Sequence, residues 1–357
     1  MSNIDPLVLK ESGDCFCASL LKDGKSIEMI DQPIENFVRL IFSSKLSWLD
    51  YTLSNVKSEA PKLASQLGFS GELLTQLLKK KNAGYEDFDH EMALLLPAII
   101  VSGFNVHVTY LLIMIKKGLI VTVHTPEIKR FFRMRRYAKI FMKKMNKYAS
   151  PIDRITLLLF RIIDENNSRN FEHLREIEEN SDHVSEKMTN VNTPRQEISL
   201  DIHTMKHSLI AYLNGLWETM DVLNTLRYGD PELLSDNPKL VAQMNGLVSE
   251  VNNQISLAEH MSEVLASGLE VMQSIYNNQL QILNNKIALL VAYLTVLGTA
   301  VLVPNTLATI LTSDVFGLSS KDQFLYLSII VGSTLISIIA SYWWVKKSGL
   351  LVDSKDN

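Results

Sequence analysis

Small and polar side chains recur near the C-terminal end of the chain at alternating steps of three and four residues. The positions are Asn278, Gln281, Asn285, Ala288, Ala292, Thr295, Thr299, Leu302, Thr306, Thr309 and Ser313. Such steps follow one side of a supercoiled helix, and Leu302 is the only large apolar side chain on that side. Neutral hydroxyl and amide oxygens suit a cation that keeps much of its water, as magnesium does. The pattern predicts a pore-lining helix for hydrated cations.

The same residue types also favour helix packing, which is the alternative interpretation. Serine and threonine can hydrogen-bond to their own backbone, and small residues let helices approach closely. The row of small and polar residues from Asn278 to Ser313, called the seam from here on, includes Asn278 and Gln281, which precede the apolar segment. Helix-packing motifs rarely need amides outside the apolar segment, so we favour the interpretation that the seam lines a path for cations.

Two long stretches contain no charged residue and no histidine, namely Ile287 to Ser313 and Phe324 to Val345. Both exceed the roughly 20 residues that a helix needs to cross a bilayer. We therefore predict a membrane protein with spans over residues 286–313 and 324–345 and a connecting loop over residues 314–323.

The flanking charges predict the orientation of the spans. Lys286 precedes the first span, Lys346 and Lys347 follow the second, and the loop holds one lysine against two aspartates. Because basic residues favour the cytoplasmic side, both termini are expected there and the loop outside. The opening residues do not resemble a signal peptide. The expected setting is the plasma or inner membrane of a prokaryotic cell, with lipid as a partner.

The predicted fold class is an α+β membrane protein. Strand-like runs cover residues 15–30, 37–44, 91–103 and 106–125, and an amphipathic helical pattern covers residues 60–80, broken at Gly68 to Gly71. The predicted parts are an N-terminal cytoplasmic α/β domain (1–150), a long helical stalk (151–285), the two C-terminal transmembrane helices and a cytoplasmic tail (346–357). Because no proline lies between Pro238 and Pro304, one helix is expected to run from the stalk into the first span.

Several other functions find little support in the sequence. The net charge of −4 gives no reason to expect nucleic acid as a partner. No glycine-rich phosphate loop, nucleophile elbow or carboxylate dyad occurs, so an enzyme is not expected. Cys15 and Cys17 have no second ligand pair nearby, and reduced structural thiols are the favoured interpretation.

Two further features have competing interpretations. His203 and His207 lie four residues apart, a spacing at which two imidazoles share a helix face and can bind a metal, but a surface or packing pair is favoured. The segment 129–147 holds nine basic residues and no acidic one. It is interpreted as a solvated helix face, with binding to anionic lipid or another polyanion as the alternative.

The order of segments resembles the CorA family of divalent-cation channels. The resemblance rests on "LLKDGK", "WLDYTLSN", "LASQLGFSGELLTQLL", "LIVTVHT" and "SPIDRITLLLFRIIDEN", followed by a stalk helix, two spans and a lysine-tipped tail. It implies a homopentamer with the first span around the pore and no tightly bound cofactor. Mg²⁺ or other divalent cations would be the transported and regulatory ions. It also implies a regulatory metal site between subunits, for which "YEDFDHE" supplies Glu86, Asp87 and Asp89, with Glu250 or Glu259 as the partner.

The family's Gly-Met-Asn signature is absent from this chain. Aligned on Pro304 and Thr306, the sequence "PNTLATILTSDVF" places Ser313, Asp314 and Val315 where the signature belongs. In the family the asparagine is taken to receive hydrated magnesium, so altered selectivity is expected here. Two hypotheses follow: a CorA-like cation channel with altered selectivity, or a scaffold or metal sensor of the same descent that no longer conducts.

Asp314 is predicted to form a ring of carboxylates at the outer mouth of the pore. Such rings concentrate cations at a pore entrance. We expect Asp314→Asn to lower the divalent-cation conductance of the reconstituted protein, most strongly at low ionic strength, and low pH to mimic the substitution. If conductance is unchanged under both conditions, Asp314 merely ends a helix in bulk water.

Overall fold

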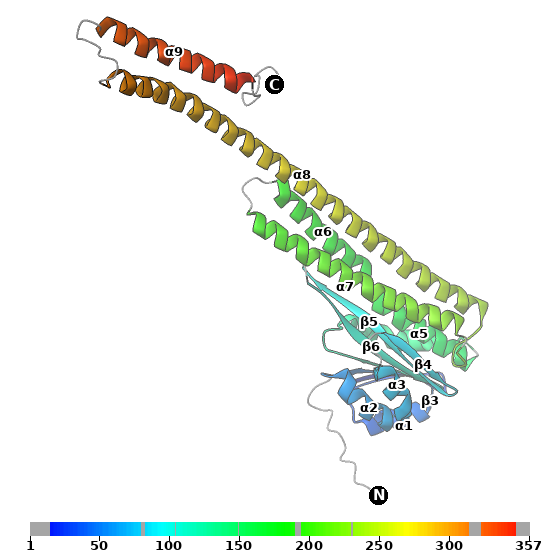
Figure 1. Ribbon diagram of the computed structural model, residues 1–357. Coiled ribbons are helices and arrows are strands. Elements are labelled where there is room, and N and C mark those ends of the chain that lie inside the picture. Colours follow the sequence, from blue (N-terminus) through cyan, green and yellow to red (C-terminus); the bar gives the residue numbers. More distant parts are fainter. Residues whose placement is uncertain are drawn as a thin grey trace. The chain divides into compact units, whose positions relative to one another are not determined.

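The computed structural model describes residues 15–79, 83–103, 105–148, 150–189, 194–229, 231–313 and 323–347. The strands are β1 (Cys15–Leu21), β2 (Ser26–Ile30), β3 (Ser44–Thr52), β4 (Gly84–Phe88), β5 (Glu91–Ser102), β6 (Asn105–Lys116) and β7 (Leu119–His124). The helices are α1 (Ile34–Phe42), α2 (Val56–Gln66), α3 (Gly71–Lys79), α4 (Arg130–Met145), α5 (Pro151–Asn167), α6 (Asn170–Thr189), α7 (Arg195–Tyr228), α8 (Pro238–Leu311) and α9 (Gln323–Lys347). Figure 1 labels most of these elements.

The chain divides into two compact units, Met1–Gly268 and Leu269–Asn357. Helix α8 belongs to both, because its 74 residues run from Pro238 to Leu311. At about 1.5 Å per residue, this helix is about 110 Å long. The expected continuous helix from the stalk into the first span is therefore confirmed.

The first unit is built on a seven-stranded sheet in the order β2-β1-β3-β7-β6-β5-β4. Neighbouring strands are antiparallel except β3 and β7, which pair in parallel and place Asp50 beside Thr122. The predicted strand-like runs over residues 15–30 and 106–125 form the hairpins β1–β2 and β6–β7. Each turn has a glycine with positive φ, namely Gly24 at 86° and Gly118 at 77°. Such backbone angles strongly favour glycine.

The predicted strand over residues 37–44 is wrong, because residues 34–42 form α1 and β3 begins at Ser44. The run is rich in residues that favour strands, but Pro33 precedes it and the apolar residues are spaced for a helix. Phe37 and Leu40 face the core while Arg39 stays outside the apolar core. Burial of that amphipathic face overrides strand propensity.

One face of the sheet packs against α1, α2 and α3. Cys15, Cys17, Leu49 and Tyr51 point from β1 and β3 into this core. Burial raises the pKa of the Cys17 thiol to about 11, so the thiol stays protonated. Both cysteines are free and pack as small apolar side chains.

The basic helix α4 lies on the other face, where its apolar side is buried against β1 and β2. Phe131, Met134, Ala138 and Met142 are each at most 1% exposed. This side is not available to a bilayer. The exposed side carries Lys139, Lys143, Lys144 and Lys147.

A buried ionic cluster links α4 to the parallel strands. The Asp50 side chain is fully buried and accepts from Arg135 Nε at 2.7 Å, and His124 Nε2 lies 3.3 Å from it. Thr122 donates a hydrogen bond to Asp50 and accepts one from the Trp48 indole at 3.0 Å. Burial alone would raise the pKa of Asp50, but His124, Arg135 and Thr122 outweigh it, and the pKa lies below its ordinary value.

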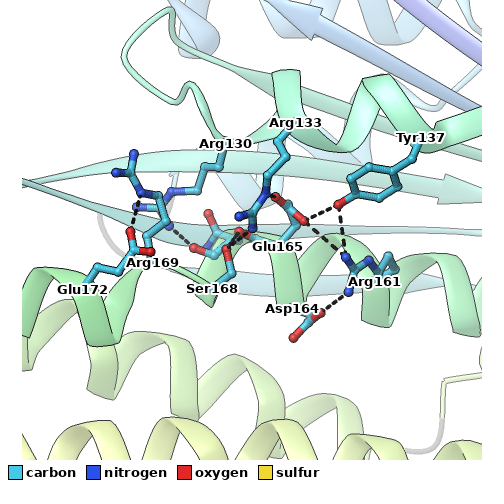
Figure 2. A network of polar contacts seen from close by, with 10 residues as sticks. Arg130, Arg133, Tyr137, Arg161, Asp164, Glu165, Ser168, Arg169 and Glu172 are labelled. Atoms are coloured by element: carbon cyan, nitrogen blue, oxygen red, sulfur yellow. Dashed lines mark hydrogen bonds and ion pairs between the residues drawn. The ribbon is translucent and has the colours of Figure 1, made fainter.

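A second polar network joins α4 to the end of α5 (Figure 2). Glu165 is 1% exposed and accepts hydrogen bonds from Arg133 Nε and Tyr137 Oη, each at 2.8 Å. The buried Arg130 donates to the backbone carbonyls of Ile99 in β5 and Asn166 in the last turn of α5, so it connects these two elements. Burial and the nearby Arg169 lower the pKa of Arg130 to about 10, which still leaves it charged at neutral pH.

The start of α6 is tied to both α7 and α8 within the first unit. Asn170 Nδ2 donates to Gln254 Oε1 of α8 at 3.0 Å, and the Tyr212 hydroxyl of α7 donates to the Asn170 carbonyl at 2.6 Å. All three side chains are at most 2% exposed. Buried hydrogen bonds of this kind are costly to break, so they fix the register of the three helices.

We predict that Asp50→Asn destabilises the first unit, because it leaves the buried charge of Arg135 without a counter-charge. The expected loss is about 3 kcal/mol, or a fall in Tm of roughly 10 °C, measured by thermal unfolding of the full chain in detergent. The folded pKa of Asp50 is depressed, so its contribution is complete above the ordinary carboxyl range and disappears as the pH falls through the folded pKa.

The matched control is Asp23→Asn, since the Asp23 side chain is 51% exposed in the β1–β2 turn. The exposed ion pair of Asp23 with Lys25 is expected to contribute less than about 1 kcal/mol to the free energy of unfolding. Equal Tm values for the two variants at neutral pH would contradict the assigned role of Asp50.

Candidate functional site

The second unit contains the last part of α8 and the helix α9 (Figure 1). Both are long and apolar enough to cross a membrane. They contact each other through Thr299 Oγ1 and Ser341 Oγ, which lie 2.5 Å apart. Both predicted spans are thus helices of the right length.

The predicted seam divides into a covered and an uncovered part. Ala292 is 3% exposed, Ala288, Thr295 and Thr299 are half-buried, and Asn285 is exposed. Leu302 is 68% exposed, and Thr306, Thr309 and Ser313 are exposed as well. Within one chain, α9 therefore contacts the seam around Thr299 and leaves open the part that follows Leu302.

Every hydroxyl of the seam donates to the backbone of its own helix. The donor and acceptor pairs are Thr295 to Val291 (2.8 Å), Thr299 to Thr295 (3.0 Å), Thr306 to Leu302 (2.7 Å), Thr309 to Asn305 (2.8 Å) and Ser313 to Ile310 (2.6 Å). A hydroxyl has one proton, so a donated proton leaves only acceptor lone pairs facing outward. The exposed part of the seam therefore presents oxygen acceptors, which attract cations and the waters bound to them.

Pro304 frees one more backbone acceptor, on another side of α8 than the exposed part of the seam. It lies inside α8 and has no N–H, so it cannot donate the helical hydrogen bond to the carbonyl of Ala300. A carbonyl freed in this way is tolerated in a membrane only against protein or water. Pro304 itself is buried, so this side of α8 packs against protein in the structure.

The predicted mouth of the pore is only partly described. Ser313 is described and exposed, whereas Asp314 and Val315 lie outside the described residues. Their roles stay predictions from the sequence.

The acidic residues predicted to bind a regulatory metal do not meet within one chain. Glu86 and Asp87 belong to the edge strand β4, Asp89 follows it, and Glu250 and Glu259 belong to α8. In the described part of the chain, no three His, Cys, Asp or Glu side chains form a metal-binding group. Burial and the nearby Asp164 raise the pKa of Glu250. A site shared between copies stays a prediction.

Sequence reasoning missed the side of α9 that packs on α8. Ser337 and Val345 are buried there, and Ser341 bonds Thr299. A signal was present, because Ser333, Ser337 and Ser341 are spaced four residues apart in an apolar helix, a pattern typical of close helix packing.

Comparison with known proteins identifies a family. A sequence profile described as "CorA-like Mg2+ transporter protein" matches residues 43–347, which is well over half of the chain. A search of curated protein sequences finds no match. The resemblance drawn from the sequence is confirmed by the profile.

Solved structures show the same fold at low sequence identity. The complete CorA magnesium transporter from Methanocaldococcus jannaschii is 16% identical, with a TM-score of 0.68 over 94% of this chain and 98% of that one. The full-length CmaX protein is 14% identical, with a TM-score of 0.65 over 95% and 98%. The ZntB cytoplasmic domain from Vibrio parahaemolyticus is 11% identical, with a TM-score of 0.53 over 74% and 98%. The predicted fold class, an α/β domain followed by a long helix and two C-terminal membrane helices, is confirmed.

Proposed function

The chain belongs to the family of CorA-like Mg²⁺ transporter proteins, and on this premise we propose that it conducts hydrated divalent cations along the polar side of α8. The observation that carries the proposal is the orientation of the seam hydroxyls. Their protons are donated to the helix backbone, so their lone pairs face outward where α8 is uncovered. Neutral acceptors bind a hydrated cation weakly enough to release it, as conduction requires.

A single α8 helix lines one side of a path and cannot enclose it. We propose a homopentamer, as the family resemblance implies, with α8 around the axis and α9 outside. The uncovered part of the seam, from Leu302 to Ser313, would face the axis, while the part around Thr299 contacts α9. Most large apolar side chains of the described part of α9 are exposed, including Phe324 at 83% and Ile336 at 69%. Those of the α8 span are exposed too, so the outer place of α9 follows from the family resemblance. Lipid is the environment that such side chains favour. Both termini would then lie in the cytoplasm.

The alternative is a protein of the same descent that binds metal but does not conduct. It is favoured by one observation, the residues Ser313, Asp314 and Val315 at the place of the Gly-Met-Asn signature. Flux measurements on reconstituted vesicles separate the two functions. Uptake of Mg²⁺, Co²⁺, Ni²⁺, Zn²⁺ and K⁺ would be compared, and absence of uptake for all five would support the alternative.

One prediction of the proposed function concerns the hydroxyl of Thr306. Thr306→Val keeps the shape of the side chain and removes the acceptor, so we expect divalent-cation flux to fall by about fivefold, the equivalent of about 1 kcal/mol for a lost hydrogen bond to the hydrated ion. The matched control is Thr312→Val, because Thr312 makes the same kind of backbone hydrogen bond but lies outside the seam. Equal effects of the two substitutions would show that the seam does not line the path.

Another prediction of the proposed function concerns Leu302, which we expect to form a hydrophobic constriction of the path. It is 68% exposed and is the large apolar member of the seam. We expect Leu302→Phe to lower flux and Leu302→Ala to raise it, each by about tenfold, or about 1.4 kcal/mol in the barrier. Leu297→Phe, on another side of α8, serves as the control. Unchanged flux in both Leu302 variants would remove this residue from the path.

A further inference from the structure

The helix α7 carries two imidazoles side by side on its exposed side. The ring centroids of His203 and His207 lie 4.4 Å apart, and the ring planes are inclined by 55°. Both residues are exposed, whereas Ile202 and Met205 on the opposite side are buried. The pair is therefore not a packing pair in the core of the first unit.

Both rings are available to a ligand. Among the described residues, no side chain or carbonyl hydrogen-bonds His203 or His207, while His107 and His124 each have an oxygen partner. The spacing of four residues turns both rings to the same side of a helix. Because α7 is 34 residues long and the pair lies in its interior, the backbone that carries the two rings is rigid.

The surroundings select the class of metal. From Leu200 to Trp217 the only acidic residue is Asp201, which is engaged by Lys187 of α6 at 2.8 Å. Magnesium and calcium require carboxylate or carbonyl oxygen, and none of these side chains offers it beside the pair. Lys206 adds a positive charge next to the rings. Only a metal that forms strong bonds to imidazole nitrogen, such as Ni²⁺, Cu²⁺ or Zn²⁺, suits this site.

We propose that His203 and His207 form a chelating site for a first-row transition-metal ion on the exposed side of α7. The two imidazoles supply two ligands, and water fills the remaining positions. The ion is therefore exchangeable, in contrast to a closed structural site with four protein ligands. The site is separate from the oxygen acceptors of α8 and does not depend on conduction.

The test is equilibrium binding of Ni²⁺ to the untagged full-length chain in detergent, with excess Mg²⁺ present to occupy oxygen sites. We expect about one Ni²⁺ per chain to resist displacement by Mg²⁺. His203→Ala and His207→Ala should each weaken binding by about tenfold or more, because the second ligand no longer acts within the same site. Acid should weaken binding in the wild-type protein, since imidazole must be neutral to bind a metal.

Two controls keep the result specific to the pair. His260→Ala removes an exposed histidine from α8 and should leave Ni²⁺ binding unchanged. His207→Ala combined with Thr204→His keeps the number of histidines but places them on adjacent positions that point apart, and it should not restore binding. These changes are at exposed or half-exposed helix positions, so folding is expected to persist. Unweakened binding in the single variants, restored binding in the rearranged pair, or no Mg²⁺-resistant Ni²⁺ binding in the wild type would each overturn the proposal.

Discussion

Backbone hydrogen bonding along α8, with one bond missing at Pro304, is the constraint on which both units depend. In the first unit α8 supplies Gln254 and a row of apolar residues to the helical layer, and in the second it forms the first apolar span. Hydrocarbon offers no partner to a peptide group, so the span has to remain helical through its whole length. Seam hydroxyls obey the same constraint, because each returns its proton to the helix. Their outward lone pairs are a consequence of that arrangement.

The two units solve the problem of polar groups away from water in different ways. The first unit buries full charges and pairs them, as Asp50 with Arg135 and Glu165 with Arg133. Buried carboxylates with specific cationic partners hold α4 and α5 in one register. Between Lys286 and Lys346 the described residues of the spans contain no ionic side chain, so polarity there is limited to hydroxyls, amides and one proline-freed carbonyl. Neutral acceptors are suited to passing ions, while paired charges are suited to holding a fold.

Candidate oxygen ligands and candidate nitrogen ligands for metal ions lie in different parts of the chain. The oxygen acceptors of α8 have no nitrogen ligand among them, and the imidazole pair of α7 has no free carboxylate beside it. A hard, strongly hydrated cation and a nitrogen-preferring transition metal would therefore bind at different places. On the two proposals made above, one kind of ion would be conducted along α8 while another would be bound on α7.

The sequence by itself determined the features that depend on local pattern. Charge-free length predicted both spans, strand-like runs predicted the strands of the two hairpins, and the 3.5-residue period predicted the seam. Features that depend on contacts distant along the chain required the tertiary structure. The sequence predicted a strand over residues 37–44. The structure has the helix α1 there, because a helix buries Phe37 and Leu40 on one side.

The same limit applies to the candidate sites. Only the fold showed that Asp50 meets Arg135 across 85 residues, that Ser341 covers Thr299, and that His203 and His207 face solvent while Asp201 is taken by Lys187. Periodicity shows which side chains share a face of a helix. What that face contacts is decided by packing, because burial and pairing energies arise between segments that the local pattern does not connect.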